Sequence, residues 1–214
     1  MPVDISSIRI EYSKHVLDEH SVAQHPFRQF DLWWGEVISA EIPEPNAMTL
    51  ATSDAEGYVE ARTVLLKGYN DHGFVFYTNY DSLKGRQLNV NPRCCLLFFW
   101  KELERQVRIL GKAEKVSMEE NQSYFNSRPE GSRIGAWASP QSKVVESRSW
   151  LEKNYEYYQE EFQKKEPACP PHWGGFRVIP HQFEFWQGRP SRMHDRILYT
   201  LEENNNWKIR RLAP

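Results

Sequence analysis

Basic side chains gather beside a tryptophan near the end of the sequence. The stretch FEFWQGRPSRMHDR places Trp186 shortly before three cationic or titratable side chains, Arg192, His194 and Arg196. If RMHDR is extended, these three project from one face, because side chains alternate along a strand. An aromatic wall beside a few placed donors is typical of a site for a planar ligand. The alternative is an exposed basic strand end that a neighbouring aspartate balances.

A second cluster lies in SYFNSRPEGS. Tyr124 and Arg128 are four residues apart, which predicts one shared helix face, and Ser132 follows shortly after a proline break. Two hydroxyls and a guanidinium can surround one phosphate. The plainer interpretation is surface packing between the tyrosine and the arginine, which is the commoner use of this spacing.

The segment YTNYDSLKGRQ indicates a further anion site. A helix is predicted to start near Ser82, directly after a strand, so Lys84 lies where free backbone N–H groups and the helix dipole favour an anion. The alternative is an ordinary capped helix with a solvated lysine. Upstream, RTVLLK adds Arg62 and Lys67, whose odd separation predicts opposite faces of a strand. These two cations then serve different anions or merely flank a core strand.

The composition limits what these clusters can serve. The chain has 214 residues, 40% hydrophobic and 14% aromatic, which is ample for one globular domain. Its net charge of −2 gives no global field that would attract nucleic acid or an anionic membrane. The sequence contains no apolar run near the ~20 residues of a membrane span and no signal-peptide core, so we expect an intracellular protein. Cys94, Cys95 and Cys169 are poorly spaced for a disulfide framework or a zinc site.

Hydrophobic periodicity predicts a mainly β protein. Helices are expected over residues 5–15, 27–40, from a capping box at 117–120 to about 128, and over 144–164. Strands are expected over residues 47–53, 59–67, 74–78, 94–100, 105–116, 176–179, 182–186, 197–201 and 207–212. Many short strands favour a closed or nearly closed antiparallel barrel with helices around it. The sequence has no glycine-rich nucleotide loop, P-loop or Gly-x-Ser-x-Gly elbow, which removes support for Rossmann and hydrolase functions.

Several of these segments together resemble one family, the pyridoxamine/pyridoxine 5′-phosphate oxidases. The matching pieces are RTVLLK, FYTNYDSLKGRQLNVNPR, LERQVRILGKAEK, YFNSRP, IGAWASPQS, WGGFRV, FEFWQG, RMHDR and WKIRRLAP. The resemblance implies a mainly β, antiparallel split barrel that binds FMN and forms a homodimer with FMN at the subunit interface. It also implies a single domain over residues 1–214, in which residues 1–20 are a flexible segment that can close over the active site.

The implied activity is FMN-dependent oxidation of two vitamin B6 phosphates. Pyridoxine 5′-phosphate and pyridoxamine 5′-phosphate would give pyridoxal 5′-phosphate, with O₂ as acceptor, H₂O₂ as product and ammonia released from the amine. Such an enzyme of vitamin B6 salvage is expected in the cytoplasm. One alternative is the related FMN oxidase of phenazine biosynthesis, which uses an unphosphorylated substrate; another is a non-catalytic FMN-binding or pyridoxal-phosphate-carrying protein on the same barrel.

The resemblance also assigns roles to individual residues. It implies a cofactor-binding set around FMN: Arg62, Thr63, Val64, Leu65, Leu66, Lys67, Tyr77, Thr78, Lys84, Gln106, Gln141, Ser142, Trp186 and Arg196. It implies a set for the substrate phosphate: Lys67, Tyr124, Arg128 and Ser132. Arg192 and His194 are implied as the catalytic pair at the substrate ring, and Arg9 and Tyr12 as N-terminal contacts that close over it. No metal is implied.

One position departs from the family pattern. The family usually carries a basic residue before the lysine of the FMN-phosphate segment, and this chain has Leu83 there. We therefore expect weaker FMN retention, unless Arg86, about one helical turn further on, replaces part of that charge.

Overall fold

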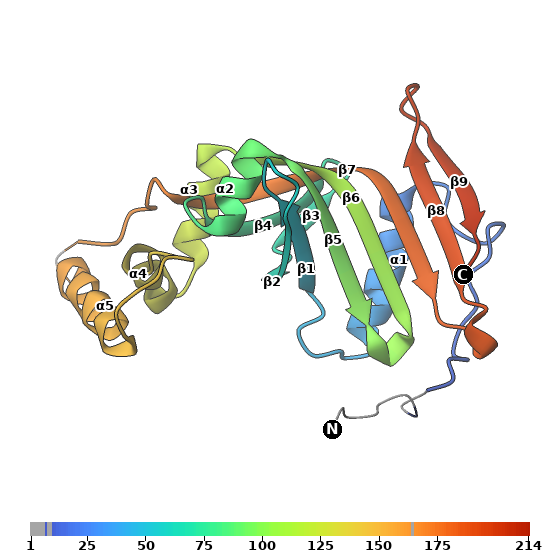
Figure 1. The fold of residues 1–214 in the computed structure, drawn as a ribbon, viewed down its shortest axis with the longest axis horizontal. Coiled ribbons are helices and arrows are strands. Elements are labelled where there is room, and N and C mark those ends of the chain that lie inside the picture. The colour runs from blue at the N-terminus through green and yellow to red at the C-terminus, as the bar shows by residue number, and fades with distance from the viewer. Residues whose placement is uncertain (1–6, 8–9, 164) are drawn as a thin grey trace. The chain divides into compact units, whose positions relative to one another are not determined.

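The computed structural model describes residues 7, 10–163 and 165–214. The backbone divides into two compact units that are interleaved along the chain (Figure 1). Unit 1 comprises residues 1–49, 95–110 and 180–214, and unit 2 comprises residues 50–94 and 111–179. Among the described residues, no helix has both the length and the apolar character that crossing a membrane requires.

Nine strands and five α-helices make up the described chain. The helices are α1 (Pro26–Ser39), α2 (Leu83–Val90), α3 (Met118–Ser127), α4 (Glu130–Ala138) and α5 (Arg148–Phe162). The strands are β1 (Ala47–Ser53), β2 (Val59–Leu65), β3 (Gly68–Asn70), β4 (Gly73–Asn79), β5 (Arg93–Trp100), β6 (Arg105–Lys115), β7 (Trp173–Gln187), β8 (Asp195–Leu201) and β9 (Trp207–Leu212). The strand order is β2-β1-β5-β6-β7-β4-β3, and β8 pairs with both β7 and β9. Short 3₁₀ turns, Lys101–Leu103 and Pro190–Arg192, precede β6 and β8.

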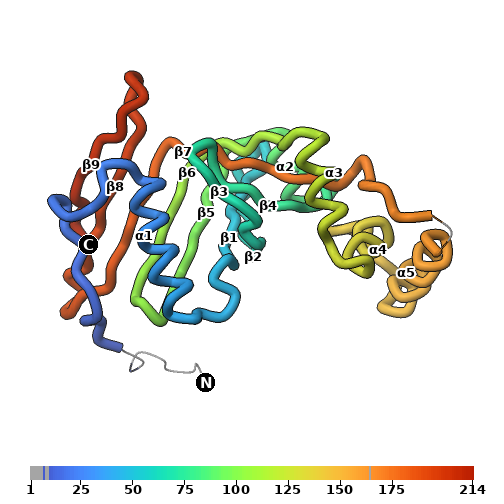
Figure 2. The backbone as a smooth tube through the Cα atoms, turned by 180° about the vertical axis from the view of Figure 1, so that it is seen from behind, coloured from blue at the N-terminus to red at the C-terminus, as the bar shows by residue number. Residues whose placement is uncertain are grey.

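In unit 1, α1 covers one face of the strands. Its apolar residues recur at helical spacing, and Phe30 and Trp33 are buried, with ring centroids 5.4 Å from Phe98 and 5.2 Å from Phe185. Figure 2 shows α1 lying along this face of β6 and β7. The predicted helix over 27–40 is thus confirmed, with Pro26 supplying the fixed φ of a first helical turn.

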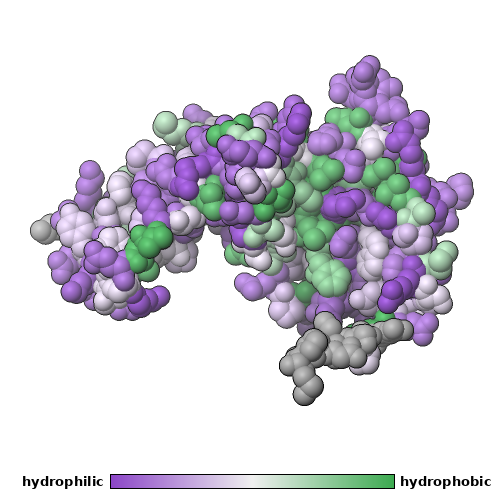
Figure 3. Space-filling model, viewed as in Figure 1, coloured by the Kyte–Doolittle hydropathy of each residue, from purple (hydrophilic) through white to green (hydrophobic). Residues whose placement is uncertain are grey.

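The opposite face of the same strands carries alternate residues of β5. Phe98 is fully buried, whereas Phe99 keeps 53% of its surface exposed. Apolar patches lie among polar side chains on the face of unit 1 that Figure 3 turns toward the viewer. The period-two pattern of β5 therefore produces one core face and one partly apolar outer face.

The N-terminal part of unit 1 does not form the helix that was predicted there. A helix was expected over residues 5–15, but residues 10–15 form none, and most of residues 5–9 lie outside the described part. The backbone N–H groups of Ser13 and Lys14 donate to Glu104 Oε2 at 2.9 and 3.1 Å. Because these donors are bound to a carboxylate of a distant segment, they are not available for a helical ladder.

Unit 2 contains the remaining helices. The predicted capping box is present, since Ser117 accepts from the Glu120 backbone and Glu120 from that of Ser117, and α3 ends before Arg128. Helix α4 was not predicted, because Pro129 was interpreted only as a stop, whereas it is also the N-cap of the next helix. Helix α5 is shorter than the predicted 144–164 and starts after the capping hydroxyl of Ser147.

Strand β7 is one strand where two were predicted. Its residues 173–178 pair with β4 and its residues 182–187 pair with β8, both antiparallel. Pro180 lies between these two pairings, where its missing N–H removes no ladder bond to β4 or β8. A proline that had indicated a break is therefore accommodated inside a continuous strand.

Candidate active site

Unit 2 contains a pocket of about 680 Å³, here called the cationic pocket. It is lined by four basic side chains, Arg62, Lys67, Lys84 and Arg128. Hydroxyl and amide groups complete it: Thr63, Tyr77, Thr78, Tyr124, Ser132 and Gln141. The two phosphate clusters that the sequence indicated, one at the start of α2 and one around Arg128, therefore open into the same pocket.

The start of α2 positions Lys84. The Ser82 hydroxyl caps the helix by accepting from the Gly85 N–H at 3.3 Å. Lys84 Nζ lies 3.1 Å from Gln141 Oε1 and 3.4 Å from Thr78 Oγ1. Burial lowers the pKa of Lys84, and the nearby Arg62 charge lowers it further. Among the described residues Lys84 forms no ion pair, so its ammonium group is suited to an anion at the helix N-terminus.

Arg62 is held against the sheet. Its guanidinium donates to the Thr52 hydroxyl and to the Leu50 carbonyl at 3.3 Å, and pairs with Glu60 at 3.3 Å. Burial lowers its pKa, and Glu60 opposes that effect. Arg62 is therefore a fixed wall of the pocket.

Arg128 lies at the C-cap of α3, with its guanidinium 4.7 Å from the centroid of the Trp173 ring. Its Nη1 is buried and has no hydrogen-bond partner among the described residues. Burial is the main cause that lowers the pKa of Arg128. A buried guanidinium nitrogen without an acceptor is costly unless a ligand supplies one.

Within the described part of the chain, Lys67, Lys84 and Arg128 form no ion pair. A pocket that contains three such cations and several hydroxyl donors fits phosphate groups. The residues present therefore suit both the phosphate of FMN and that of a second molecule. The fold produces this property by bringing together Lys67, Lys84 and Arg128 from three separate segments.

The lining of the cationic pocket differs from the prediction for one pair of residues, and two of the predicted cofactor-binding residues do not line it. Arg62 and Lys67 were expected on opposite strand faces, but β2 ends at Leu65, so Lys67 lies outside the strand, and both residues line the pocket. Leu66 is buried, 5% exposed, and does not line it. Ser142 also lies outside the lining, in a left-handed backbone conformation with φ of 70°.

Unit 1 contains a second pocket of about 380 Å³, here called the aromatic pocket. Tyr12, Arg189, Arg192 and His194 are among its lining residues. The Trp186 ring lies beside it, with its centroid 4.6 Å from that of His194 and 5.9 Å from that of Tyr12. The structure thus brings together the predicted catalytic pair, Tyr12 and Trp186. Arg9 lies outside the described residues.

His194 is held in a defined neutral form. Its Nδ1 accepts the backbone N–H of Arg189 at 3.1 Å, which leaves the ring proton on Nε2. Burial lowers the pKa of His194, and the Arg192 charge lowers it further. The side chain therefore presents an N–H donor at neutral pH.

The predicted extended conformation of RMHDR is wrong. Pro190–Arg192 form a 3₁₀ turn, Ser191 and Arg192 have φ of 54° and 61°, and β8 begins only at Asp195. Arg192 and Arg196 are consequently not alternate residues of one strand. The left-handed turn explains how Arg192 and His194 line one pocket without strand geometry.

Arg196 is oriented by a buried carboxylate. Glu184 is 2% exposed, accepts from Arg196 Nε at 2.8 Å and also pairs with Arg108. The hydrogen bond to Glu184 raises the pKa of Arg196. The Ala213 carbonyl accepts from Arg196 Nη1 at 2.9 Å. Gln106 lies on β6, also in unit 1, half-buried.

Sequence reasoning missed two of these residues. Glu184 alternates with Phe183 and Phe185, so an ionisable residue within an apolar strand was its signal. Trp173 begins β7 and lines the cationic pocket. Its signal was a tryptophan followed by two glycines, a pattern in which the backbone leaves space for other side chains.

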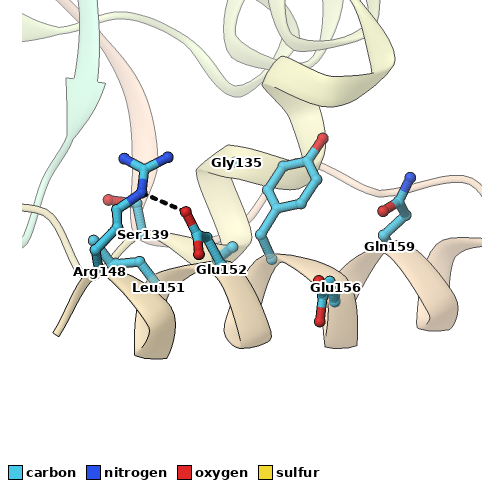
Figure 4. Close-up of a pocket in the computed structure, with 9 residues that line it drawn as sticks. Gly135, Ser139, Arg148, Leu151, Glu152, Glu156 and Gln159 are labelled. Carbon is cyan, nitrogen blue, oxygen red and sulfur yellow. Dashed lines mark hydrogen bonds and ion pairs between the residues drawn. The ribbon is translucent and has the colours of Figure 1, made fainter. Parts of the chain in front are cut away.

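A further pocket lies between α4 and α5, with a volume of about 530 Å³. Figure 4 shows it lined by Ser139 of the segment after α4 and by Arg148, Leu151, Glu152, Glu156 and Gln159 of α5. Its one arginine is paired with Glu152 at 2.8 Å, and Glu156 adds a second acid. An acidic lining of this kind does not suit a phosphate.

Comparison with known proteins defines the class. A family model described as pyridoxamine 5′-phosphate oxidase matches residues 35–161, and one described as the pyridoxine 5′-phosphate oxidase C-terminal dimerisation region matches residues 173–214. Curated relatives named pyridoxine/pyridoxamine 5′-phosphate oxidase include one from Synechocystis, 52% identical over 99% of both chains. Another, from Burkholderia mallei, is 55% identical over 98% of this chain and 99% of its own.

Two solved structures are similar in fold. The crystal structure of PhzG from Burkholderia lata, in complex with tetrahydrophenazine-1-carboxylic acid, has a TM-score of 0.86 and 28% identity, covering 93% of this chain and 98% of that one. A pyridoxamine 5′-phosphate oxidase-related, FMN-binding protein from Nostoc punctiforme has a TM-score of 0.71 and 16% identity, covering 90% and 100%. The predicted antiparallel split-barrel fold is confirmed by these likenesses.

The fold and the cationic pocket together define an FMN-type oxidoreductase of the split-barrel class. The chain belongs to the pyridoxamine 5′-phosphate oxidase family. FMN, the cofactor of that family, is its cofactor.

Proposed function

We propose that the chain oxidises pyridoxine 5′-phosphate and pyridoxamine 5′-phosphate to pyridoxal 5′-phosphate, with O₂ as acceptor and H₂O₂ as product, and ammonia released from the amine. The activity serves vitamin B6 salvage. The observation that carries this proposal is the cationic pocket, in which Lys67, Lys84 and Arg128 have no anionic partner among the described residues. One FMN phosphate and one substrate phosphate are the anions that these cations accommodate.

Each residue set has a distinct task. Arg62, Lys84, Thr78 and Gln141 hold the FMN phosphate, and Lys67, Tyr124, Arg128 and Ser132 hold the substrate phosphate. When bound, FMN supplies the capacity to accept a hydride and pass electrons to O₂. Fixing both phosphates restricts the reacting carbon to one orientation, which lowers the entropic part of the barrier.

In the proposed homodimer, where each copy contributes to both sites, the aromatic pocket supplies the contacts to the substrate ring. Arg192 donates to the ring oxygen or nitrogen, and His194, neutral with its proton on Nε2, is a second donor. Trp186 is a flat wall beside His194. Arg196, held by Glu184, is a fixed cation that stabilises negative charge on the reduced cofactor.

Selection of a phosphorylated substrate separates this proposal from a phenazine-type oxidase. The phenazine-type oxidase is a definite alternative because this chain and PhzG are similar in fold. The ligand in the PhzG complex, tetrahydrophenazine-1-carboxylic acid, brings a carboxylate with two oxygens and no phosphate, so it would offer fewer acceptors to Lys67, Arg128 and the two hydroxyls beside them than a phosphate does. The vitamin B6 phosphates are therefore favoured.

The proposal includes a homodimer with FMN at the subunit interface. The match to a dimerisation region over residues 173–214 supports this arrangement. The partly apolar outer face of unit 1, where Phe99 is 53% exposed, provides a surface that a second copy would cover.

An anaerobic absorbance spectrum of the FMN-loaded protein tests the activity. Adding pyridoxine 5′-phosphate should bleach the flavin band, and admitting air should restore it with formation of H₂O₂. Unphosphorylated pyridoxine at equal concentration is the control and should bleach the band far more slowly. A flavin band that ignores the phosphorylated substrate would favour a phenazine-type oxidase or a non-catalytic FMN-binding protein.

A further inference from the structure

Three nearly parallel aromatic rings form one wall of the cationic pocket. The Trp173 and Tyr77 centroids are 5.3 Å apart at 14°, and those of Tyr77 and Tyr124 are 3.9 Å apart at 21°. The Trp173 and Tyr124 rings are 6.1 Å apart at 7°. Phe125 meets the Trp173 ring edge-on at 5.3 Å. Trp173 is thus fixed from several sides, and it is 7% exposed.

The second glycine after Trp173, Gly175, makes room for this wall. In the register of β4 and β7, Tyr77 lies opposite Gly175. A Cβ at Gly175 would come within 2.9 Å of the Tyr77 ring and 3.0 Å of a Val116 methyl group. Only glycine permits the Tyr77 ring to lie flat here, so the backbone of β7 is adapted to the ring wall.

The guanidinium of Arg128 packs over the Trp173 ring of this wall. Its central carbon is 4.7 Å from the Trp173 centroid, against 5.9 Å for Phe125. The guanidinium has no carboxylate partner among the described residues, and Nη1 is buried without an acceptor. The indole face is therefore the main feature that fixes its direction, because a ring face attracts a cation held above it.

We propose that Trp173 is a positioning residue that holds Arg128 by its ring face, and so determines how tightly the site binds the phosphate of its substrate. The inference rests on the proposed function for the identity of the substrate. The phosphate-binding role of Trp173 can be measured without turnover. A preoriented guanidinium loses less side-chain freedom when the phosphate binds.

Binding of inorganic phosphate to the FMN-loaded protein, measured by calorimetry, tests the proposal directly. Trp173→Leu should weaken phosphate binding about ten-fold, and Trp173→Phe about three-fold, since a desolvated cation–π contact is worth this much and a smaller ring attracts less. The matched control is Trp207→Leu, which removes an indole that packs on His25 and Phe183 in unit 1. It should leave phosphate binding unchanged.

A double-mutant cycle separates positioning from general packing. In an Arg128→Ala background, Trp173→Leu should cause no further loss of phosphate affinity, because the cation it orients is gone. An equal loss in both backgrounds, or unchanged affinity in Trp173→Leu, would overturn the proposal. If Trp173→Leu does not fold, fluorinated tryptophan can be incorporated at every tryptophan position instead. Fluorination weakens the attraction of the ring face for a cation, so it should weaken phosphate binding in the wild type. It should have no such effect in Trp173→Phe, which lacks the indole that contacts Arg128.

Turnover gives a second readout. The KM for pyridoxine 5′-phosphate should rise about ten-fold in Trp173→Leu while kcat stays within about two-fold, because the contact concerns binding of the phosphate and not the reacting carbon. A wild-type protein that binds phosphate but does not oxidise this substrate would refute the proposed function. The calorimetric comparison would still decide the role of Trp173.

Discussion

At the scale of single residues, the site depends on charges that the fold leaves without partners or fixes in one form. The buried Nη1 of Arg128 and the acceptor Nδ1 of His194 are opposite cases. Arg128 Nη1 has no acceptor among the described residues and can bind an anion, whereas His194 Nδ1 already accepts a backbone N–H. Both conditions arise from local backbone geometry, the C-cap of α3 and the turn before β8.

The charge on Arg192 should lower the pKa of His194 further than burial alone does. Burial and Arg192 lower the pKa of His194, so the imidazole stays neutral at neutral pH and gains a proton only below its ordinary range. Arg192→Gln should raise this pKa, so that protonation, with loss of the Arg189 hydrogen bond, begins at a higher pH. NMR titration of the His194 ring measures this pKa in the wild type and in the variant. Arg210→Gln, on the exposed β9, should leave the pKa unchanged; no rise in Arg192→Gln would contradict the assignment.

At the scale of elements, the start of α2 is the clearest determinant of anion binding. Leu83 is its first residue, where the family usually has a basic side chain. Arg86 donates to the Asp81 carbonyl, so its guanidinium is engaged with the turn that precedes the helix. The expected compensation by Arg86 is thereby reduced.

Leu83→Arg should strengthen FMN binding about two- to five-fold, the usual effect of a charge at an exposed helix terminus. Fluorescence titration of the FMN-free protein at matched ionic strength measures the dissociation constant, and Leu83→Gln is the uncharged control. The gain should shrink as salt is added. Equal affinity in Leu83→Arg and the wild type would show that Leu83 does not limit retention.

Sequence patterns predicted the elements whose signals are local. The capping box of Ser117 and Glu120 and the period of α1 were sufficient, because backbone and side-chain preferences agreed there. Helix α4, the continuity of β7 through Pro180 and the left-handed turn at Arg192 were not predicted, since each depends on partners distant in sequence. The residue types of the cationic pocket were recognised, but not that Arg62 and Lys67 line it together.

At the scale of the whole molecule, the outer face of unit 1 should determine assembly. Phe99→Glu places a charge on this partly apolar face, away from α1, and should raise the dimer dissociation constant at least about ten-fold, because burying an unpaired carboxylate is costly. Sedimentation velocity over a dilution series measures it, with FMN retention followed in parallel. The control is Met118→Glu, because Met118 is 84% exposed at the start of α3 in unit 2. A dimer unaffected by Phe99→Glu would place the interface elsewhere.

The division into two units also bears on how such a chain can be altered. All four boundaries between the units fall inside strands, namely β1, β5, β6 and β7, and none falls in a loop. No contiguous stretch of the gene therefore encodes either unit, and a fragment cut at any boundary would expose a severed strand. Recombination could not exchange one unit for another as a cassette. The cationic pocket of unit 2 and the aromatic pocket of unit 1 are thus encoded by interleaved stretches of one gene.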